Sequence, residues 1–299
     1  MASLRVDFAG LRSAISSATG LRLEASPLER VGGGCINECV RWETDAGPLF
    51  IKLSGIKQLD VFEAEAAGLQ ELAQPAAVRV PAVMGLGIGG DHAFLALEWL
   101  DLVGSDGNSD ARLGEQLAHL HRTRGQGFGW YRDNTIGSTP QLNGWSMDWT
   151  EFFAGRRLGC QFDLAERNGY GGRLTERGAV LRDSCAAFNA GRDVVPSLLH
   201  GDLWGGNKGT DASGMPVIFD PATYFGDREA DLAMTRLFGG FAKEFYEAYE
   251  SVWPLDGGAE LRTDLYNLYH VLNHLNLFGG GYAAQAQAMI DRLLGELGH

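Results

Sequence analysis

The sequence predicts an α+β chain with two lobes: a small antiparallel-sheet lobe with one main helix, then a larger, mostly helical lobe. Three observations lead to this. Short apolar runs bounded by Gly and Pro, which are typical of strands, are concentrated before residue 101. Amphipathic patterns of helical period dominate the rest. A stretch rich in Gly, Ser and Asp at 102–109 separates the two. We therefore expect lobes at 1–101 and 102–299.

The first lobe is expected to be a sheet around one helix. Strand-like segments within 27–42 flank the Gly-rich turn Gly32-Gly33-Gly34, and 48–53 is an apolar run typical of a buried strand. A helix is predicted over 58–73, because apolar residues recur there at spacings of three and four. Pro75 ends it. Segments 80–90 and 92–100 are predicted to form a hairpin.

The second lobe is expected to be helical apart from the stretch 194–231. Asp110 is a candidate N-cap for a helix carrying Leu113, Leu117 and Leu120. Further helices are predicted at 149–164, 174–189, 230–252 and 260–278. The last has a continuous stripe of leucines on one face: Leu261, Leu265, Leu268, Leu272 and Leu275.

Composition excludes several classes of function. The 299 residues contain 25 Lys+Arg and 38 Asp+Glu, a net charge of −13, and no basic stripe, which argues against nucleic acid as a partner. No apolar run approaches the ~20 residues of a membrane span, so we expect no membrane partner and a cytoplasmic location. Four cysteines do not make a disulfide scaffold, and the Cys35–Cys39 spacing lacks the second pair of a zinc site.

The densest motif is His200-Gly201-Asp202-Leu203-Trp204-Gly205-Gly206-Asn207, followed by an apolar strand that ends in Asp220. Phosphoryl transfer from ATP requires a carboxylate that accepts the proton of the attacking hydroxyl, and an Asn and a second Asp that hold Mg²⁺ against the phosphates. The spacing matches the kinase pattern H-x-D-x-x-x-x-N with a later metal-binding Asp. Here that Asp begins Asp-Pro-Ala rather than Asp-Phe-Gly.

The first lobe offers the groups that would hold ATP. Lys52 lies in the middle of a buried strand, where a lysine needs a carboxylate or phosphate partner. The next helix carries Glu63 and Glu65, and Glu65 lies closer to its inward stripe. The glycines Gly32, Gly33 and Gly34 could cover the phosphates through their N–H groups, although a plain hairpin turn would look the same. The backbone between Glu98 and Leu100 would read the adenine edge.

With these residues in place, nearly the whole chain resembles the fructosamine-3-kinase (ketosamine kinase) family. The shared strings include Gly32-Gly33-Gly34-Cys35-Ile36-Asn37, Asp133-Asn134-Thr135-Ile136-Gly137-Ser138-Thr139-Pro140-Gln141, the His200–Asn207 motif, Gly226-Asp227-Arg228-Glu229-Ala230-Asp231, and Asn273-His274-Leu275-Asn276. The aminoglycoside phosphotransferases and choline kinases share the His200–Asn207 pattern but not the Asp133–Gln141 string. The resemblance implies a protein-kinase-like fold.

The resemblance also implies an activity: ATP-dependent phosphorylation of a sugar hydroxyl, O3, on a glycated amine, small or protein-linked, whose phosphate then eliminates and leads to deglycation. It implies that Asp202 is the catalytic base, that Asn207 and Asp220 bind Mg²⁺, and that Lys52 and Glu65 form the phosphate-positioning pair. Asp231 is expected to anchor the catalytic loop through backbone bonds.

Four further residues are candidates for a functional role, although packing in the core could also explain some of them. The ring of Trp204 could form one wall of the sugar site, or it could be an aromatic side chain that only packs against its neighbours. His274 and Asn273 lie on a helix that the family places near the cleft, although His274 could be a core histidine. Cys35, in the glycine loop, is a candidate redox site, because the family has been proposed to form a disulfide between chains there; a small buried hydrophobe is the alternative.

Two other functions stay open at this point. One is a different small-molecule kinase of the same fold, acting on an aminoglycoside or choline. The other is a kinase-like binding protein, which is disfavoured because Lys52, Asp202, Asn207 and Asp220 are all present. The sequence leaves the preferred ketosamine open, and the state as monomer or homodimer.

Overall fold

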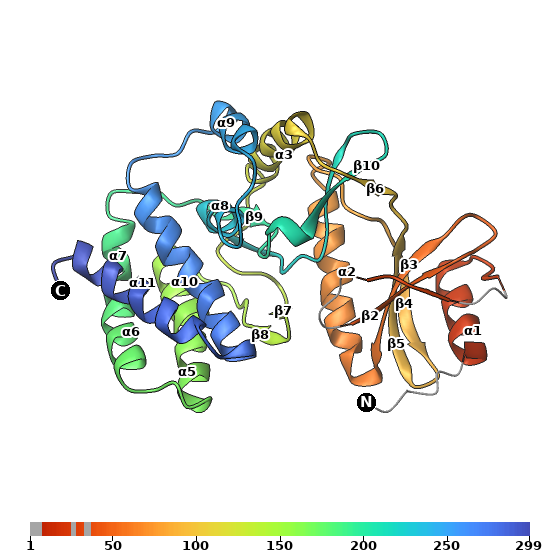
Figure 1. Ribbon diagram of the computed structural model, residues 1–299, viewed down its shortest axis with the longest axis horizontal. Coiled ribbons are helices and arrows are strands. Elements are labelled where there is room, and N and C mark those ends of the chain that lie inside the picture. Colours follow the sequence, from red (N-terminus) through yellow and green to blue (C-terminus); the bar gives the residue numbers. More distant parts are fainter. Residues whose placement is uncertain (1–7, 25–27, 33–36) are drawn as a thin grey trace.

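A five-stranded antiparallel sheet of order β1-β2-β3-β5-β4 forms the first lobe, with helices α1 and α2 on opposite faces (Figure 1). The computed structural model describes residues 8–24, 28–32 and 37–299. In chain order this lobe contains α1 (Phe8–Thr19), β1 (Glu29–Arg30), β2 (Glu38–Trp42), β3 (Leu49–Gly55), α2 (Leu59–Ala73), β4 (Val83–Gly89) and β5 (His92–Glu98).

The period-two alternation of the strands assigns each side chain to a face. On β5, Phe94 and Ala96 pack in the cluster that contains α1, whereas Ala93, Leu95 and Leu97 pack in the cluster that contains Phe62 of α2. On β3, Ile51 belongs to the α1 cluster. Lys52, the next residue, therefore lies on the α2 face, where Glu65 can reach it.

The second lobe is built around α10 (Ala259–Phe278), which contacts α8, α11 and α5. The leucine stripe predicted on this helix is buried in the main core, with Leu261 at its edge. The other elements are β6 (Leu102–Val103), α3 (Gly107–Leu120), β7 (Asn134–Ile136), β8 (Thr139–Gln141), α4 (Trp149–Phe152), a π-helical segment (Phe153–Gly159), α5 (Cys160–Arg167), α6 (Arg173–Asp183), α7 (Cys185–Phe188), β9 (Ser197–Leu199), β10 (Lys208–Asp211), β11 (Pro216–Ile218), β12 (Tyr224–Gly226), α8 (Glu229–Arg236), α9 (Lys243–Val252) and α11 (Tyr282–Glu296).

Two small sheets in this lobe carry the motif-dense stretch. β9 pairs antiparallel with β12, and β10 pairs with both β11 and β6. Chain segments 200–207 and 219–223 leave these strands side by side, since Ala222 N donates to His200 O at 2.9 Å. The His200–Asn207 motif and the Asp220 segment are thereby brought together.

The helices differ from the sequence predictions in several places. The helix expected over 230–252 is two helices, because Phe238, Gly239 and Gly240 have φ of +45°, +103° and +76°, which a right-handed helix cannot include. Asp106, not Asp110, caps α3: it accepts from Ser109 N at 2.8 Å, and the Ser109 hydroxyl accepts from Asp106 N in return. Helix α11 was not predicted at all.

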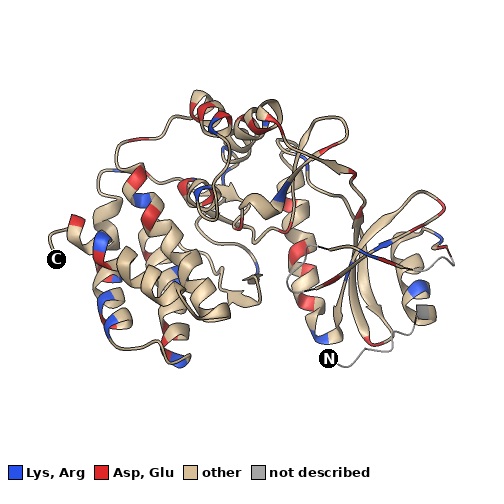
Figure 2. Ribbon diagram, in the orientation of Figure 1, with Lys and Arg blue, Asp and Glu red and all other residues tan. Residues whose placement is uncertain are grey.

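The fold class itself is confirmed: a sheet lobe with one main helix is followed by a mostly helical lobe (Figure 1). Lys and Arg are interspersed among Asp and Glu on both lobes (Figure 2). None of the helices in the described ranges combines the length with the hydropathy that a membrane span requires.

Candidate active site

Asp202, Asn207 and Asp220 lie together at the boundary of the lobes. The Asn207 side-chain amide donates to the main-chain oxygen of Asp202 at 2.8 Å and to its carboxylate at 3.2 Å. It also lies 3.4 Å from the main-chain oxygen of Asp220. One buried amide therefore fixes the conformation of the loop that carries Asp202 and ties it to the Asp220 segment.

Asp231 on α8 anchors the loop that carries Asp202 through hydrogen bonds to its main chain, as expected from the sequence. Its carboxylate accepts from the backbone N–H groups of His200 and Gly201 at 2.7 and 2.8 Å, and lies 3.2 Å from Nε2 of His121. Burial alone would raise the pKa of Asp231, but the hydrogen bond and charge of His121, with the backbone donors, hold that pKa below its ordinary value. Asp231 thus stays ionised as a fixed acceptor.

Lys52 on β3 forms ion pairs with a carboxylate from each lobe. Its ammonium lies 2.7 Å from Glu65 Oε1 and 2.5 Å from Asp220 Oδ1, and its side chain is only 6% exposed. Burial works to lower the pKa of Lys52, but the two carboxylates raise it above its ordinary value, so the cation is retained. Glu63, the rejected alternative, instead faces Arg132 at 3.7 Å on the exposed side of α2.

Asp220 is the exposed acid of the site, with its side chain 46% exposed and its backbone in the left-handed region at φ +57°. Asp tolerates this region better than most residues, and strained backbone is frequent at functional sites. Burial, and then the negative charge of Asp220, raise the pKa of Asp202 to about 7. A general base works best with a pKa near the working pH.

The donor set fits Mg²⁺ bound together with a nucleotide. Asp220 offers an exposed carboxylate, and Asn207 commits its NH₂ group to Asp202, which leaves its amide oxygen to face a cation. The described residues contain no cluster of three or more His, Cys, Asp or Glu that could hold a metal unaided. Phosphate oxygens would have to complete the shell, as Mg²⁺ sites in kinases require.

The nucleotide side of the site is described only in part. Gly32 lies just beyond β1, whereas Gly33, Gly34 and Cys35 lie outside the described residues, so those predictions are not addressed. The carboxylate of Glu98 is held by Arg79 at 2.7 Å and by Ala82 N at 3.2 Å, and the Glu98 main-chain N–H donates to Ala82 O at 2.9 Å, so that N–H is already used within the sheet lobe. Leu100 lines a pocket of about 300 Å³ with Arg79 and Trp99.

The predicted substrate residues separate into two groups. Trp204 is 38% exposed and His274 is half-buried, both open to solvent. Asn273 is buried; it donates to Ile136 O at 3.3 Å and accepts from Gln161 at 3.2 Å. Its contacts join α10 to the β7–β8 hairpin, so Asn273 positions that hairpin rather than facing the open side.

Side chains of the Asp133–Gln141 string form hydrogen bonds to the main chain of the segment that follows Asp220. Asn134 donates to Thr223 O at 2.8 Å, and Gln141 donates to Ala222 O at 3.1 Å. Asn143 donates to Asn134 Oδ1 and in turn accepts from the fully buried Arg157, at 2.8 and 2.7 Å. This network of amides fixes the two residues that follow Asp220-Pro221.

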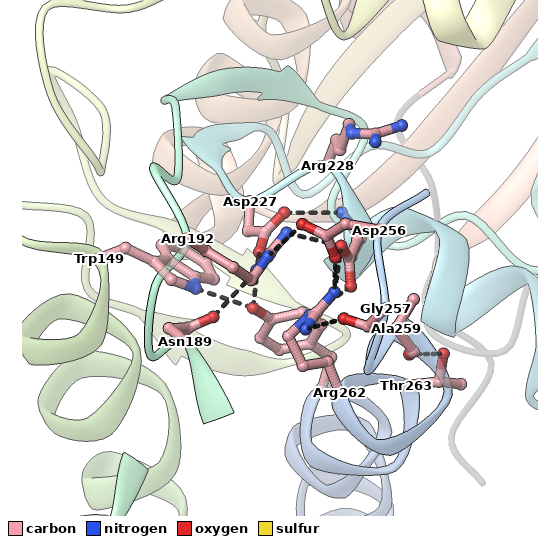
Figure 3. A network of polar contacts seen from close by, with 12 residues as sticks. Trp149, Asn189, Arg192, Asp227, Arg228, Asp256, Gly257, Ala259, Arg262 and Thr263 are labelled. Atoms are coloured by element: carbon pink, nitrogen blue, oxygen red, sulfur yellow. Dashed lines mark hydrogen bonds and ion pairs between the residues drawn. The ribbon is translucent and has the colours of Figure 1, made fainter. Parts of the chain in front are cut away.

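A second polar network holds α8 itself (Figure 3). Arg192 lies 2.7 Å from Asp227 and 2.6 Å from Glu229, and Arg262 lies 2.7 Å from the other oxygen of Glu229. Tyr266 donates to Asp227 at 2.7 Å. Since Asp227 and Glu229 lie four and two residues before Asp231, this network fixes the start of the helix whose Asp231 anchors the His200–Asn207 loop.

The profile of the fructosamine kinase family matches residues 9–296. The chain belongs to the fructosamine kinase family. A "Probable ketoamine kinase" from Synechocystis sp. is 45% identical over 281 residues, which cover 94% of each chain. A chloroplastic "Protein-ribulosamine 3-kinase" from Arabidopsis thaliana is 43% identical over 92% of this chain and 85% of its own length.

Solved structures agree with this family assignment. A "putative fructosamine-3-kinase" from Thermobifida fusca superposes with a TM-score of 0.85 at 31% identity, covering 95% of this chain and 98% of its own. An aminoglycoside phosphotransferase, solved with ADP and hygromycin B, has a TM-score of 0.68 over 95% and 98% of the two chains, at 15% identity. At that identity the likeness shows the protein-kinase-like fold alone.

Proposed function

We propose that this protein is a ketosamine kinase that transfers the γ-phosphoryl group of ATP to a sugar hydroxyl, O3, of a glycated amine. The observation that carries the proposal is the joined arrangement of Lys52, Glu65, Asp202, Asn207 and Asp220, in a chain that belongs to the fructosamine kinase family throughout its length. The named relatives act on ketoamines or ribulosamines, which supports the same substrate class here.

The chemistry assigns one role to each group. The hydroxyl oxygen attacks the γ-phosphorus, the bond from phosphorus to the β,γ-bridging oxygen breaks, and ADP leaves. Asp202 accepts the hydroxyl proton. Lys52, oriented by Glu65, positions the phosphates. Asn207 and Asp220 would hold Mg²⁺, which when bound offsets the charge of the phosphates. Glycine N–H groups of the loop containing Gly32 would cover the phosphates, and the backbone at Glu98 and Leu100 would contact adenine.

The substrate is proposed to be a small or protein-linked ketosamine in the cytoplasm. The resulting 3-phosphate is unstable and eliminates, so the reaction leads to deglycation. Aminoglycoside and choline acceptors are not favoured, because the enzymes of this fold that use such acceptors are not the family matched here. A binding protein without catalysis is not favoured, because all the catalytic groups are in contact.

A substrate panel tests the proposal. ADP release would be measured with ribulosyl-lysine, fructosyl-lysine, kanamycin and choline, each with Mg²⁺ and ATP. Turnover of at least one ketosamine, with none of kanamycin or choline, is the expected result. Turnover of kanamycin or choline without any ketosamine turnover would overturn it.

A further inference from the structure

Phe238 lies in the turn between α8 and α9, and its aromatic ring contacts the rings of both Trp204 and His274. The ring of Phe238, between α8 and α9, has its centroid 4.6 Å from that of His274 and 6.3 Å from that of Trp204. Phe238 is 41% exposed and Trp204 is 38% exposed. We call these three rings, which come from separate segments, the ring wall (Trp204, Phe238 and His274). His274 also packs against Phe278 and Tyr282, with ring centroids 5.5 and 5.3 Å away, and these two rings support it from the α10–α11 side.

The conformation of the ring wall is energetically unfavourable at Phe238, and the rings of Phe238 and Trp204 are not fully buried. Phe238 has φ +45°, which is unfavourable for a bulky residue and is typically retained at sites of function. The indole of Trp204 lies against Gly206, where an added Cβ would be 2.4 Å from the ring. Packing would bury such rings, so their exposure next to the catalytic loop points to a ligand.

The ring wall also has a hydrogen-bond acceptor. Nδ1 of His274 lies 2.8 Å from the main-chain oxygen of His270, and since a carbonyl only accepts, Nδ1 carries the proton. In the neutral imidazole Nε2 then has a lone pair. No hydrogen bond from the described residues uses that nitrogen, and the Lys and Arg side chains that stack on rings do so elsewhere, for example Arg236 on Tyr246. Among the described residues, no Lys or Arg therefore stacks on Trp204 or Phe238, and the lone pair of His274 Nε2 has no donor.

We propose that the ring wall binds the protonated secondary amine of the ketosamine; this inference rests on the proposed function. The amine nitrogen is four bonds from O3, so it lies within about 5 Å of the hydroxyl that Asp202 deprotonates. Trp204 is two residues after that base in the same loop, and its main-chain N–H donates to the main-chain oxygen of Asp202 at 3.2 Å, so the backbone that carries the first ring is fixed to the backbone of the base. Aromatic rings attract ammonium groups, Trp most strongly, and His274 Nε2 can accept one N–H. A free ketose lacks this cation, so the ring wall selects glycated amines.

The test separates the cation from the shape of the substrate. KM and kcat would be measured for fructosyl-lysine and for its ether analogue, in which oxygen replaces the secondary amine. In Phe238→Leu we expect the KM for the amine to rise roughly two- to thirty-fold, with kcat little changed and the KM for the ether unchanged. Phe238→Tyr keeps a ring and should retain the wild-type KM. Tyr131→Leu removes a ring that is 62% exposed and lies outside the ring wall, so it should leave the KM for both the amine and the ether unchanged.

Two results would overturn the inference. One is an unchanged KM for the amine in Phe238→Leu. The other is an equal rise for amine and ether, which would mean that the rings select by shape alone. Trp204→Leu, on another segment, should behave as Phe238→Leu does, and it decides alone if the Phe238 variant does not fold. A wild-type enzyme that turns over no ketosamine would overturn the proposed function, and this inference with it.

Discussion

Gly68 on α2 lies between the Lys52–Glu65 ion pair and the segment that follows Asp220, and a larger side chain at this position should separate the two. It lies three residues after Glu65 on the same helix, with the segment that follows Asp220 directly beside it. An added Cβ would be 3.0 Å from Thr223 Oγ1 and 3.4 Å from Pro221 Cγ. Gly68→Ala gains up to about 1 kcal/mol of helix propensity and needs shifts of only a few tenths of an ångström, so its stability should stay near wild type.

Gly68→Val adds two further methyl groups where the neighbour is a backbone-fixed segment. Overpacking of this kind costs about 1–3 kcal/mol. Because the amides of Asn134 and Gln141 hold the segment on its other side, α2 should move and draw Glu65 from Lys52. Misplaced reacting groups lower rates steeply, so we expect kcat/KM for ATP to fall roughly 10- to 100-fold.

The assay compares urea denaturation and steady-state kinetics for wild type, both Gly68 variants and Gln70→Val. Gln70 is exposed on the same helix, so that variant measures the cost of a β-branched residue without the contact. A Gly68→Val enzyme with wild-type kcat/KM for ATP would refute the coupling. So would an equal loss in Gln70→Val.

Three further predictions concern Asp231, Asp220 and Cys35. The depressed pKa of Asp231 gives stability that is present above about pH 4 and is lost as the pH falls through its lower folded value. Urea denaturation of Asp231→Asn should therefore show lower stability than wild type at pH 7 and a difference that shrinks toward pH 2; a constant difference would contradict this. Asp220→Ala should abolish the Mg²⁺ dependence of ATP binding in calorimetry, and equal affinity to wild type at saturating Mg²⁺ would exclude Asp220 as a ligand. Burial raises the pKa of the Cys39, Cys160 and Cys185 thiols, so inactivation by diamide that dithiothreitol reverses should disappear in Cys35→Ala; equal inactivation of both enzymes would exclude Cys35.

The side chains that meet in the candidate site could be predicted to do so because each lies in a contiguous string with a local pattern. Asp202, Asn207 and Asp220 are fixed by spacing, and Glu65 follows from the stripe of α2. The fold class follows from periodicity for the same reason. These are short-range properties of the chain.

Phe238 could not be found in this way, because its role depends on a break in a helix and on two rings distant in sequence. Gly239 and Gly240 were the available signal, but apolar periodicity on both sides outweighed them. Similarly, Asp106 rather than Asp110 caps α3. Asp110 instead forms a buried ion pair with Lys208, which only the tertiary structure reveals.

The central claim, that Asp202 accepts the proton of the attacking hydroxyl, is tested most directly by Asp202→Asn. The substitution keeps the shape and an oxygen to accept from Asn207, but removes the proton acceptor. The measurement is single-turnover phosphorylation of a ketosamine at saturating Mg²⁺ and ATP. We expect a rate lower by about 10²–10⁴-fold with ATP affinity retained. A rate near that of the wild type would contradict it.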